Sequence, residues 1–141
     1  MVLRLLEFWR DARGDQEYPR LAQLDEAAMP ELWPFCIVLD LAGNAADPVT
    51  VAAGRTISSY AGTRLQGLRV SGFEKDTLPA HAVAYFDEVL RKLVPISRGG
   101  SFRDGRGVSI LYRSIVLPMS QDGTTVTALI AAANCREVAS S

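Results

Sequence analysis

The sequence predicts an α+β fold built around a single five-stranded antiparallel sheet. Three consecutive strands are expected between residues 95 and 137, because the pairs Asp104-Gly105 and Asp122-Gly123 separate apolar and β-branched runs. An Asp-Gly pair between such runs is typical of a β-hairpin with a type I′ turn, in which both central residues have positive φ. Two more strands are expected nearer the N-terminus, and a helical crossover joins them to this three-strand meander.

The first two strands are predicted at 35–41 and 49–53, on either side of a turn rich in Gly, Asn, Asp and Pro. The strands at 35–41 and 126–135 are the most uniformly apolar in the chain. Continuous apolarity is typical of a strand covered on both faces, which places these two strands side by side in the middle of the sheet. The predicted strand order is therefore 2-1-5-4-3, with helices on one face.

Residues 2–13 are predicted to form an amphipathic helix. Val2, Leu5, Leu6 and Trp9 are spaced i, i+3, i+4 and i+7, which gives one apolar stripe. A helix of about 12 residues is marginal alone in water, so this one must dock on something. It docks either on its own sheet or on a second copy of the chain, and Leu5 and Trp9 are the candidate dimer contacts.

Three further helical segments are expected. Asp25 is a candidate N-cap for a short helix at 26–33, and another short helix is predicted at 55–61. A longer helix is predicted at 79–93, where a proline suits the first helical turn. The crossover at 63–77 shows no sustained period and is expected to be irregular, with at most one helical turn.

Composition argues against several classes of protein. The chain has 141 residues, of which 48% are hydrophobic and 22% are charged, as expected of a single globular domain. The net charge of −1 gives no basic excess for nucleic-acid binding. No apolar run approaches the roughly 18–20 residues that cross a membrane, and early charges interrupt any signal peptide, so a cytoplasmic location is expected. One histidine and two cysteines exclude a multi-histidine metal site and a Cys-x-x-Cys centre.

Short motifs occur in a particular order along nearly the whole chain. They are Leu6-Glu-Phe-Trp-Arg10 and Pro19 in the lead, Met29-Pro-Glu-Leu-Trp-Pro34 before the first strand, Ala53-Gly54 after the second, Tyr60-Ala-Gly62 and Leu65-Gln-Gly67 in the crossover, and Leu117-Pro118 with Asp122-Gly123 in the closing hairpin. In this order they resemble a bacterial family of short PAS-like proteins with an N-terminal helical lead. One departure is Gly54-Arg55, where such proteins often have Gly-Thr.

The resemblance implies a PAS fold, with a helical lead at 1–34 and a PAS-like domain at 35–141 that together form one structural unit. PAS domains bind small ligands or cofactors, or serve as dimerisation modules in signalling. The resemblance therefore implies an unidentified small-molecule ligand, a signalling partner in trans and a homodimer. It supplies no catalytic residues, and haem and flavin have no supporting motif here, so the cofactor is unknown.

Five side chains are candidates for lining a ligand cavity between helices and sheet: Tyr60, Phe73, His81, Phe86 and Tyr112. Alanines at 128 and 131–133 either leave room for that cavity or permit close helix packing. His81 is either a ligand contact or a surface histidine in the first turn of a helix.

Two other groups of residues have competing interpretations. Cys36 and Cys135 mark the start of the first strand and the end of the last, and they are either a redox pair or two buried thiols, with the second favoured in a reducing cytosol. Four arginines flank the first Asp-Gly turn and form either a phosphate-binding edge or a solvated hairpin: Arg98, Arg103, Arg106 and Arg113.

These features predict a sensory or signalling module rather than an enzyme. Ligand binding would bias the lead helix or the crossover between two arrangements, and a partner protein would read the change. One alternative is a small α+β enzyme with acid–base chemistry by His81 and a carboxylate, although Asp87 and Glu88 are predicted on the wet face of their helix. The other alternative is a ligand-free dimerisation scaffold with a filled core.

Overall fold

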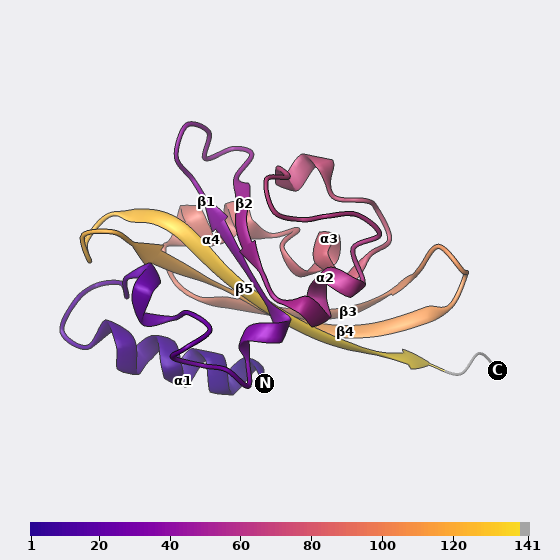
Figure 1. The fold of residues 1–141 in the computed structure, drawn as a ribbon, viewed down its shortest axis with the longest axis horizontal. Helices are drawn as coiled ribbons and strands as arrows, with labels where there is room; N and C mark the ends of the chain where they lie inside the picture. The colour runs from indigo at the N-terminus through magenta and orange to yellow at the C-terminus, as the bar shows by residue number, and fades with distance from the viewer. Residues whose placement is uncertain (139–141) are drawn as a thin grey trace.

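The computed structural model describes residues 1–138 and contains one five-stranded antiparallel sheet in the order β2-β1-β5-β4-β3 (Figure 1). The strands are β1 (Cys36–Asp40), β2 (Val49–Ala53), β3 (Ile96–Arg103), β4 (Ser109–Ser120) and β5 (Val126–Val138). In the centre of the sheet Val38 of β1 pairs with Ile130 of β5. The predicted strand order and the central pairing of the two most apolar strands are confirmed. Residues 139–141 of the predicted domain lie outside the described residues.

Helices cover both faces of the sheet. They are α1 (Val2–Arg13), α2 (Arg55–Ser59), α3 (Leu78–Ala82) and α4 (Phe86–Lys92), with 3₁₀ turns η1 (Leu21–Gln23), η2 (Trp33–Phe35) and η3 (Val70–Gly72). Figure 1 shows α1 on one side of the sheet and α2, α3 and α4 on the other. Within residues 1–138 no helix combines the length and apolarity needed to cross a bilayer.

The central strand β1 serves two hydrophobic cores, because its side chains alternate between the faces of the sheet. Cys36 and Val38 pack on the α1 side, whereas Ile37 and Leu39 pack on the side of α2–α4. All four side chains are at most 2% exposed. The sequence prediction that this strand is covered on both faces is therefore confirmed.

Helix α1 docks on the sheet of its own chain. Leu5 and Trp9 are 0% and 3% exposed, and the Trp9 indole Nε1 donates a hydrogen bond to the Pro118 carbonyl oxygen at 2.8 Å. These two side chains, expected as dimer contacts, are thus core residues of a single chain. The homodimer stays a prediction, and it would need a different surface.

Two helix predictions were wrong. The helix predicted at 79–93 is two helices, α3 and α4. Between them, the Tyr85 hydroxyl lies 2.8 Å from Ser114 Oγ of β4. Each helix contributes a buried side chain to the core on this side of the sheet. Val83 lies directly after α3, and Val89 lies within α4. The segment at 26–33 forms turns at 26–28 and 30–32 that lead into η2, and the Ala28 amide in the first turn donates to Asp25 Oδ1 at 2.9 Å.

The hairpin turns also differ from the predicted type I′ geometry. In each loop only one glycine has positive φ: Gly107 at +79° and Gly123 at +86°. The aspartates shape these loops through their side chains, because Oδ1 of Asp104 accepts from the Val108 amide and Oδ1 of Asp122 accepts from the Thr125 amide. Both loops are therefore longer, side-chain-stabilised turns.

The docking of α1 predicts unequal effects of two leucine truncations. Leu5→Ala should lower the free energy of unfolding by about 2–5 kcal/mol, because it leaves a cavity in the core. Leu3→Ala is the matched control, since Leu3 lies on the same helix with 73% of its surface exposed and should change stability little. Urea denaturation of both variants checks this, and equal effects would contradict the docking.

Candidate functional site

A cavity of about 140 Å³ lies where α3 begins, between the β3–β4 hairpin and the end of β5. We call it the hairpin pocket. It is lined by Tyr60, Asp76, Thr77, Leu78, Phe102, Asp104, Arg106, Ile110, Cys135, Arg136 and Glu137. The lining combines apolar side chains with hydroxyl, thiol, carboxylate and guanidinium groups, which is typical of a small-molecule site.

Strand length produces the hairpin pocket. β1 pairs with β5 only as far as Ala132, so within the described residues β4 is the only strand that pairs with residues 133–138 of β5. Beyond Ala132, β1 no longer pairs with β5. There Cys135 lies close to Tyr60, the residue directly after α2.

The opposite wall of the pocket is the first turn of α3. Thr77 caps this helix by accepting a hydrogen bond from the Ala80 amide at 3.4 Å. Asp76, directly before it, has φ +59° in the left-handed region, which is sterically unfavourable for most non-glycine residues. This backbone geometry holds Asp76 at the pocket wall.

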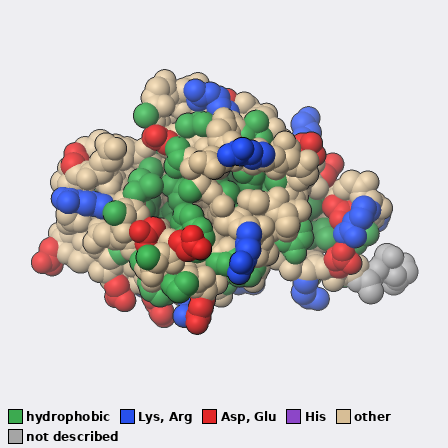
Figure 2. Space-filling view, in the orientation of Figure 1, with side chains coloured by type: hydrophobic (Ala, Val, Ile, Leu, Met, Phe, Trp, Pro, Cys, Tyr) green, Lys and Arg blue, Asp and Glu red, His purple; other side chains and the backbone are tan. Residues whose placement is uncertain are grey.

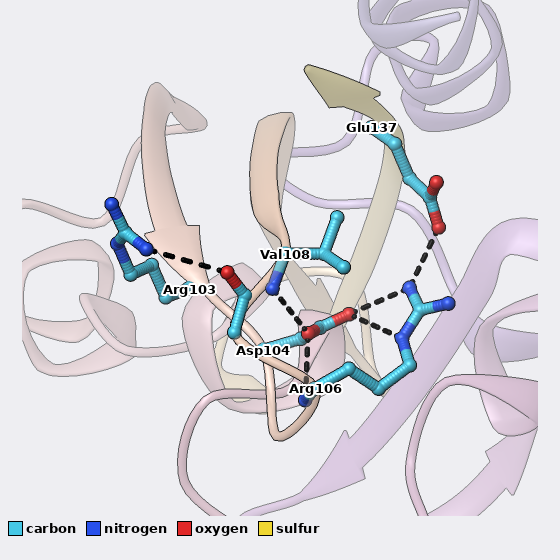
Figure 3. Close-up of polar contacts among 6 residues, drawn as sticks. Arg103, Asp104, Arg106, Val108 and Glu137 are labelled. Atoms are coloured by element: carbon cyan, nitrogen blue, oxygen red, sulfur yellow. Dashed lines mark hydrogen bonds and ion pairs between the residues drawn. The ribbon is translucent and has the colours of Figure 1, made fainter. Parts of the chain in front are cut away.

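An ion network ties the hairpin loop to the last strand (Figure 3). Arg106 Nη2 lies 2.7 Å from Asp104 Oδ2 and 2.6 Å from Glu137 Oε1. Hydrogen bonding from Arg106 lowers the pKa of Asp104, and the two carboxylates raise the pKa of Arg106. Side chains of both charges accordingly gather at this end of the molecule in Figure 2.

Three aromatic rings back the pocket wall at Phe102. The His81 ring stacks on Phe102 with centroids 4.2 Å apart and an interplanar angle of 11°. Tyr112 lies 5.5 Å from His81 and 5.8 Å from Phe102, both in tilted geometry. The histidine therefore fastens α3 to the hairpin through ring contacts.

The structure brings only part of the predicted ligand site together. Tyr60 lines the pocket, and His81 and Tyr112 pack around its Phe102 wall. Phe73 and Phe86 instead belong to the core under α2–α4. Their part in ligand binding stays a prediction. The contributions of Asp76, Arg106 and Glu137 were not foreseen, because they come from three segments that only the sheet register brings together.

The interior between helices and sheet is closely packed. Ile57, Leu65 and Val83 are at most 2% exposed there. Of the alanines expected to leave room, Ala131 and Ala133 face this core, whereas Ala128 and Ala132 face α1. The alanines of β5 thus permit close helix packing.

The two cysteines lie on opposite faces of the sheet, so the redox-pair hypothesis is wrong. Cys36 packs on the α1 side, donates to the Leu32 carbonyl oxygen at 3.3 Å, and has its pKa raised to about 12 by burial. Cys135 packs on the other side, where burial raises its pKa. Contact with the Cys135 side chain also raises the pKa of Tyr60.

The four arginines of the predicted phosphate-binding edge do not converge. Arg98 pairs with Glu88 at 2.7 Å and lies over the Tyr85 ring, while Arg106 is held in the ion network. Arg113 lies on the face of β4 that also carries Ile115, away from both. In the described residues there is also no group of three His, Cys, Asp or Glu side chains suited to a metal ion.

Comparison with known proteins rests on solved structures. No protein-family model matches this chain, and no curated protein matches it in sequence. The light-state LOV domain of the blue-light photoreceptor Aureochrome1 matches with a TM-score of 0.53 and 13% identity, over 82% of this chain and 89% of that one. LOV domains are a PAS subfamily. The chain has a PAS-like fold.

Two further LOV structures agree. The LOV domain of the blue-light activated histidine kinase of Erythrobacter litoralis EL346 gives a TM-score of 0.53 at 12% identity, over 74% of this chain and 98% of that one. A LOV domain studied with a flavin analogue gives 0.55 at 12% identity, over 80% and 83%. The PAS-like fold expected from the motif order is thereby confirmed.

The ion network predicts a pH-dependent contribution of Asp104 to stability. Because its pKa is lower in the folded protein, this contribution is complete above the ordinary aspartate pKa of about 4 and is lost as the pH falls through the lowered value. Asp104→Asn keeps the acceptor oxygen of the turn but removes the charge. Its urea midpoint should fall below that of the wild type at pH 7, and the gap should close towards pH 2.

The matched control is Asp15→Asn, at an exposed aspartate outside this network. Its midpoint should follow that of the wild type at both pH values. An Asp104→Asn gap of equal size at pH 7 and pH 2 would refute a charge-based role.

Proposed function

We propose that this chain is a sensory or signalling module that takes a small ligand in the hairpin pocket and passes a change of conformation to a partner protein. The observation that carries the proposal is the pocket itself, which forms where two helical segments meet the hairpin and the last strand. The PAS-like fold supports it, since the similar structures are domains of blue-light photoreceptors.

The size of the pocket limits the ligand to a small molecule. Its 140 Å³ equals the liquid volume of about five water molecules, below the roughly 300–1,000 Å³ of pockets for drug-sized ligands. Three carboxylates and two guanidinium groups line it, which leaves a net charge of −1, and Arg106 pairs with two of the carboxylates. The remaining charge favours a neutral or cationic ligand with hydrogen-bond donors over an anion.

The chain does not fit a flavin. A three-ring isoalloxazine needs a large slot between helices and sheet, and here Ile57, Leu65 and Val83 fill that space. The hairpin pocket is too small to replace it. The likeness to LOV domains therefore extends to the fold and not to a flavin site.

The pocket is placed to couple a ligand to movement. Its walls belong to the start of α3, to the β3–β4 hairpin and to the end of β5; the His81–Phe102 stack connects α3 to the hairpin, and the Arg106 network connects the hairpin to β5. A ligand that binds one arrangement of these walls better than another shifts the population between them. A partner in trans that contacts the hairpin would read the shift.

One alternative is supported by a specific observation. The closely packed interior is what a ligand-free interaction module requires. The enzyme alternative has less support, because Glu88 pairs with Lys92 and Arg98 and the His81 ring packs against Phe102.

Fragment titration monitored by amide NMR tests the ligand proposal. Three probes of similar size and different charge are used: methylguanidinium, acetamide and acetate. We expect shifts centred on Leu78, Phe102 and Cys135 for the first two, and weaker ones for acetate. Cys135→Phe, which fills the pocket, should abolish these shifts.

The matched control is Leu111→Phe, which adds the same ring on the opposite face of the sheet and should leave the shifts unchanged. Shifts that persist in Cys135→Phe, or that scatter over the surface, would contradict the ligand site. The ligand-free interaction module would then be the better description.

A further inference from the structure

Half of the sheet face on the α1 side is left uncovered. Helix α1 packs on Ile115, Leu117 and Met119 of β4, but the strand continues backwards to Arg113 and Leu111. In Figure 1 the β3–β4 hairpin and the end of β5 extend well beyond α1. The same face of the sheet is therefore apolar and covered at one end, and polar and open at the other.

The open half forms a shallow depression of about 600 Å³, which we call the arginine face. Arg113 lies between Asn134 of β5 and Gly99 of β3 in the sheet register. One step along, Leu111 lies between Arg136 and Ser101. Alternation along the strands places these side chains on one face. Gly99 contributes no side chain to this face.

The arginine face carries positive charge without a counter-charge. The lining residues include Arg113 and Arg136 and contain no Asp or Glu. Within residues 1–138 neither guanidinium takes part in an ion pair, whereas Arg98 and Arg106 are both paired with carboxylates. The side chain next to them, Leu111, is 36% exposed and supplies an apolar anchor.

We propose that the arginine face docks an acidic amphipathic helix of a partner protein. The covered half of the same face already holds a helix, α1, through Leu5 and Trp9. The three open strands span about 10 Å, which matches the diameter of one more helix beside it. Carboxylates of the incoming helix would pair bidentately with Arg113 and Arg136, while an apolar side chain packs on Leu111.

Two other occupants fit less well. Single-stranded nucleic acid binds sheet faces through exposed aromatic rings that stack on the bases, and the outward-facing positions here are Ser, Gly, Leu, Arg and Asn. A second copy packed face to face by a two-fold axis would set the arginines of one chain against those of the other. An acidic amphipathic helix supplies both carboxylates for the two arginines and an apolar side chain for Leu111.

This site differs from the hairpin pocket, because Leu111, Arg113 and Asn134 face the α1 side of the sheet, although Cys135 and Arg136 border both cavities. It goes beyond the proposed function by naming the chemistry of the partner. The two proposals can be refuted separately, because the absence of a ligand in the hairpin pocket would leave the arginine face open to a partner.

Binding of a synthetic helical peptide tests the proposal. The probe is a fluorescein-labelled peptide of about 15 residues with Leu on one stripe and Glu beside it, and the comparison peptide has Gln at every Glu position. We expect the Glu peptide to bind at least about tenfold more tightly in fluorescence anisotropy, with affinity that falls as salt is raised. Amide NMR should place the shifts at Gly99, Leu111 and Asn134.

The double variant Arg113→Ser/Arg136→Ser should lose at least about tenfold of that affinity. Its matched control is Arg55→Ser/Arg64→Ser, which removes the same charge from exposed positions on the helical side. This control should keep nearly all of the affinity for the Glu peptide. Equal loss in the control, or no preference for Glu over Gln, would overturn the proposal.

Two further measurements separate the other occupants. Tighter binding of oligo-uridine than of the Glu peptide would overturn the proposal in favour of nucleic acid. Self-association in sedimentation that the Arg113→Ser/Arg136→Ser variant abolishes would overturn it in favour of a second copy.

Discussion

The pairing of β1 with β5 is the contact on which the whole structure depends. Both strands are apolar on both faces, and Val38 and Ile130 pair at the centre of the sheet. Each face of this pair forms the floor of a separate core, one beneath α1 and one beneath α2–α4. Because a short helix such as α1 is marginal alone in water, α1 is stabilised by packing on this pair of strands.

Unequal strand lengths then generate both surfaces of functional interest. β1 and β2 have 5 residues each, whereas β4 and β5 have 12 and 13. The longer strands run on past the central pair and leave a region of sheet with thin cover. The hairpin pocket forms on one side of this region and the arginine face on the other.

The chain shares its fold with LOV domains, and its own side chains fill the space between helices and sheet. Ala131 and Ala133 of β5 are fully buried, as is Ala82 of α3, and these small side chains let helix and strand approach closely. The proposed ligand site and the proposed partner site therefore both lie at the extended end of the sheet.

The sequence by itself determined the sheet order, the lead helix at 2–13 and the positions of the strands, because apolar periodicity and turn residues are local signals. It also predicted Tyr60, His81 and Tyr112 as ligand contacts; these side chains lie in or beside the hairpin pocket, and their part in binding stays a prediction. It did not predict the break between α3 and α4, where Tyr85 contacts Ser114, a residue 29 positions away on β4.

Only the tertiary structure decided which side chains share a surface. Cys36 and Cys135 are both on central strands, yet the pleat sends them to opposite faces. Arg106 is neutralised by Glu137, 31 residues away, while Arg113 is left to join Arg136. Such groupings depend on register and strand length across the whole sheet, and no stretch of sequence contains that information alone.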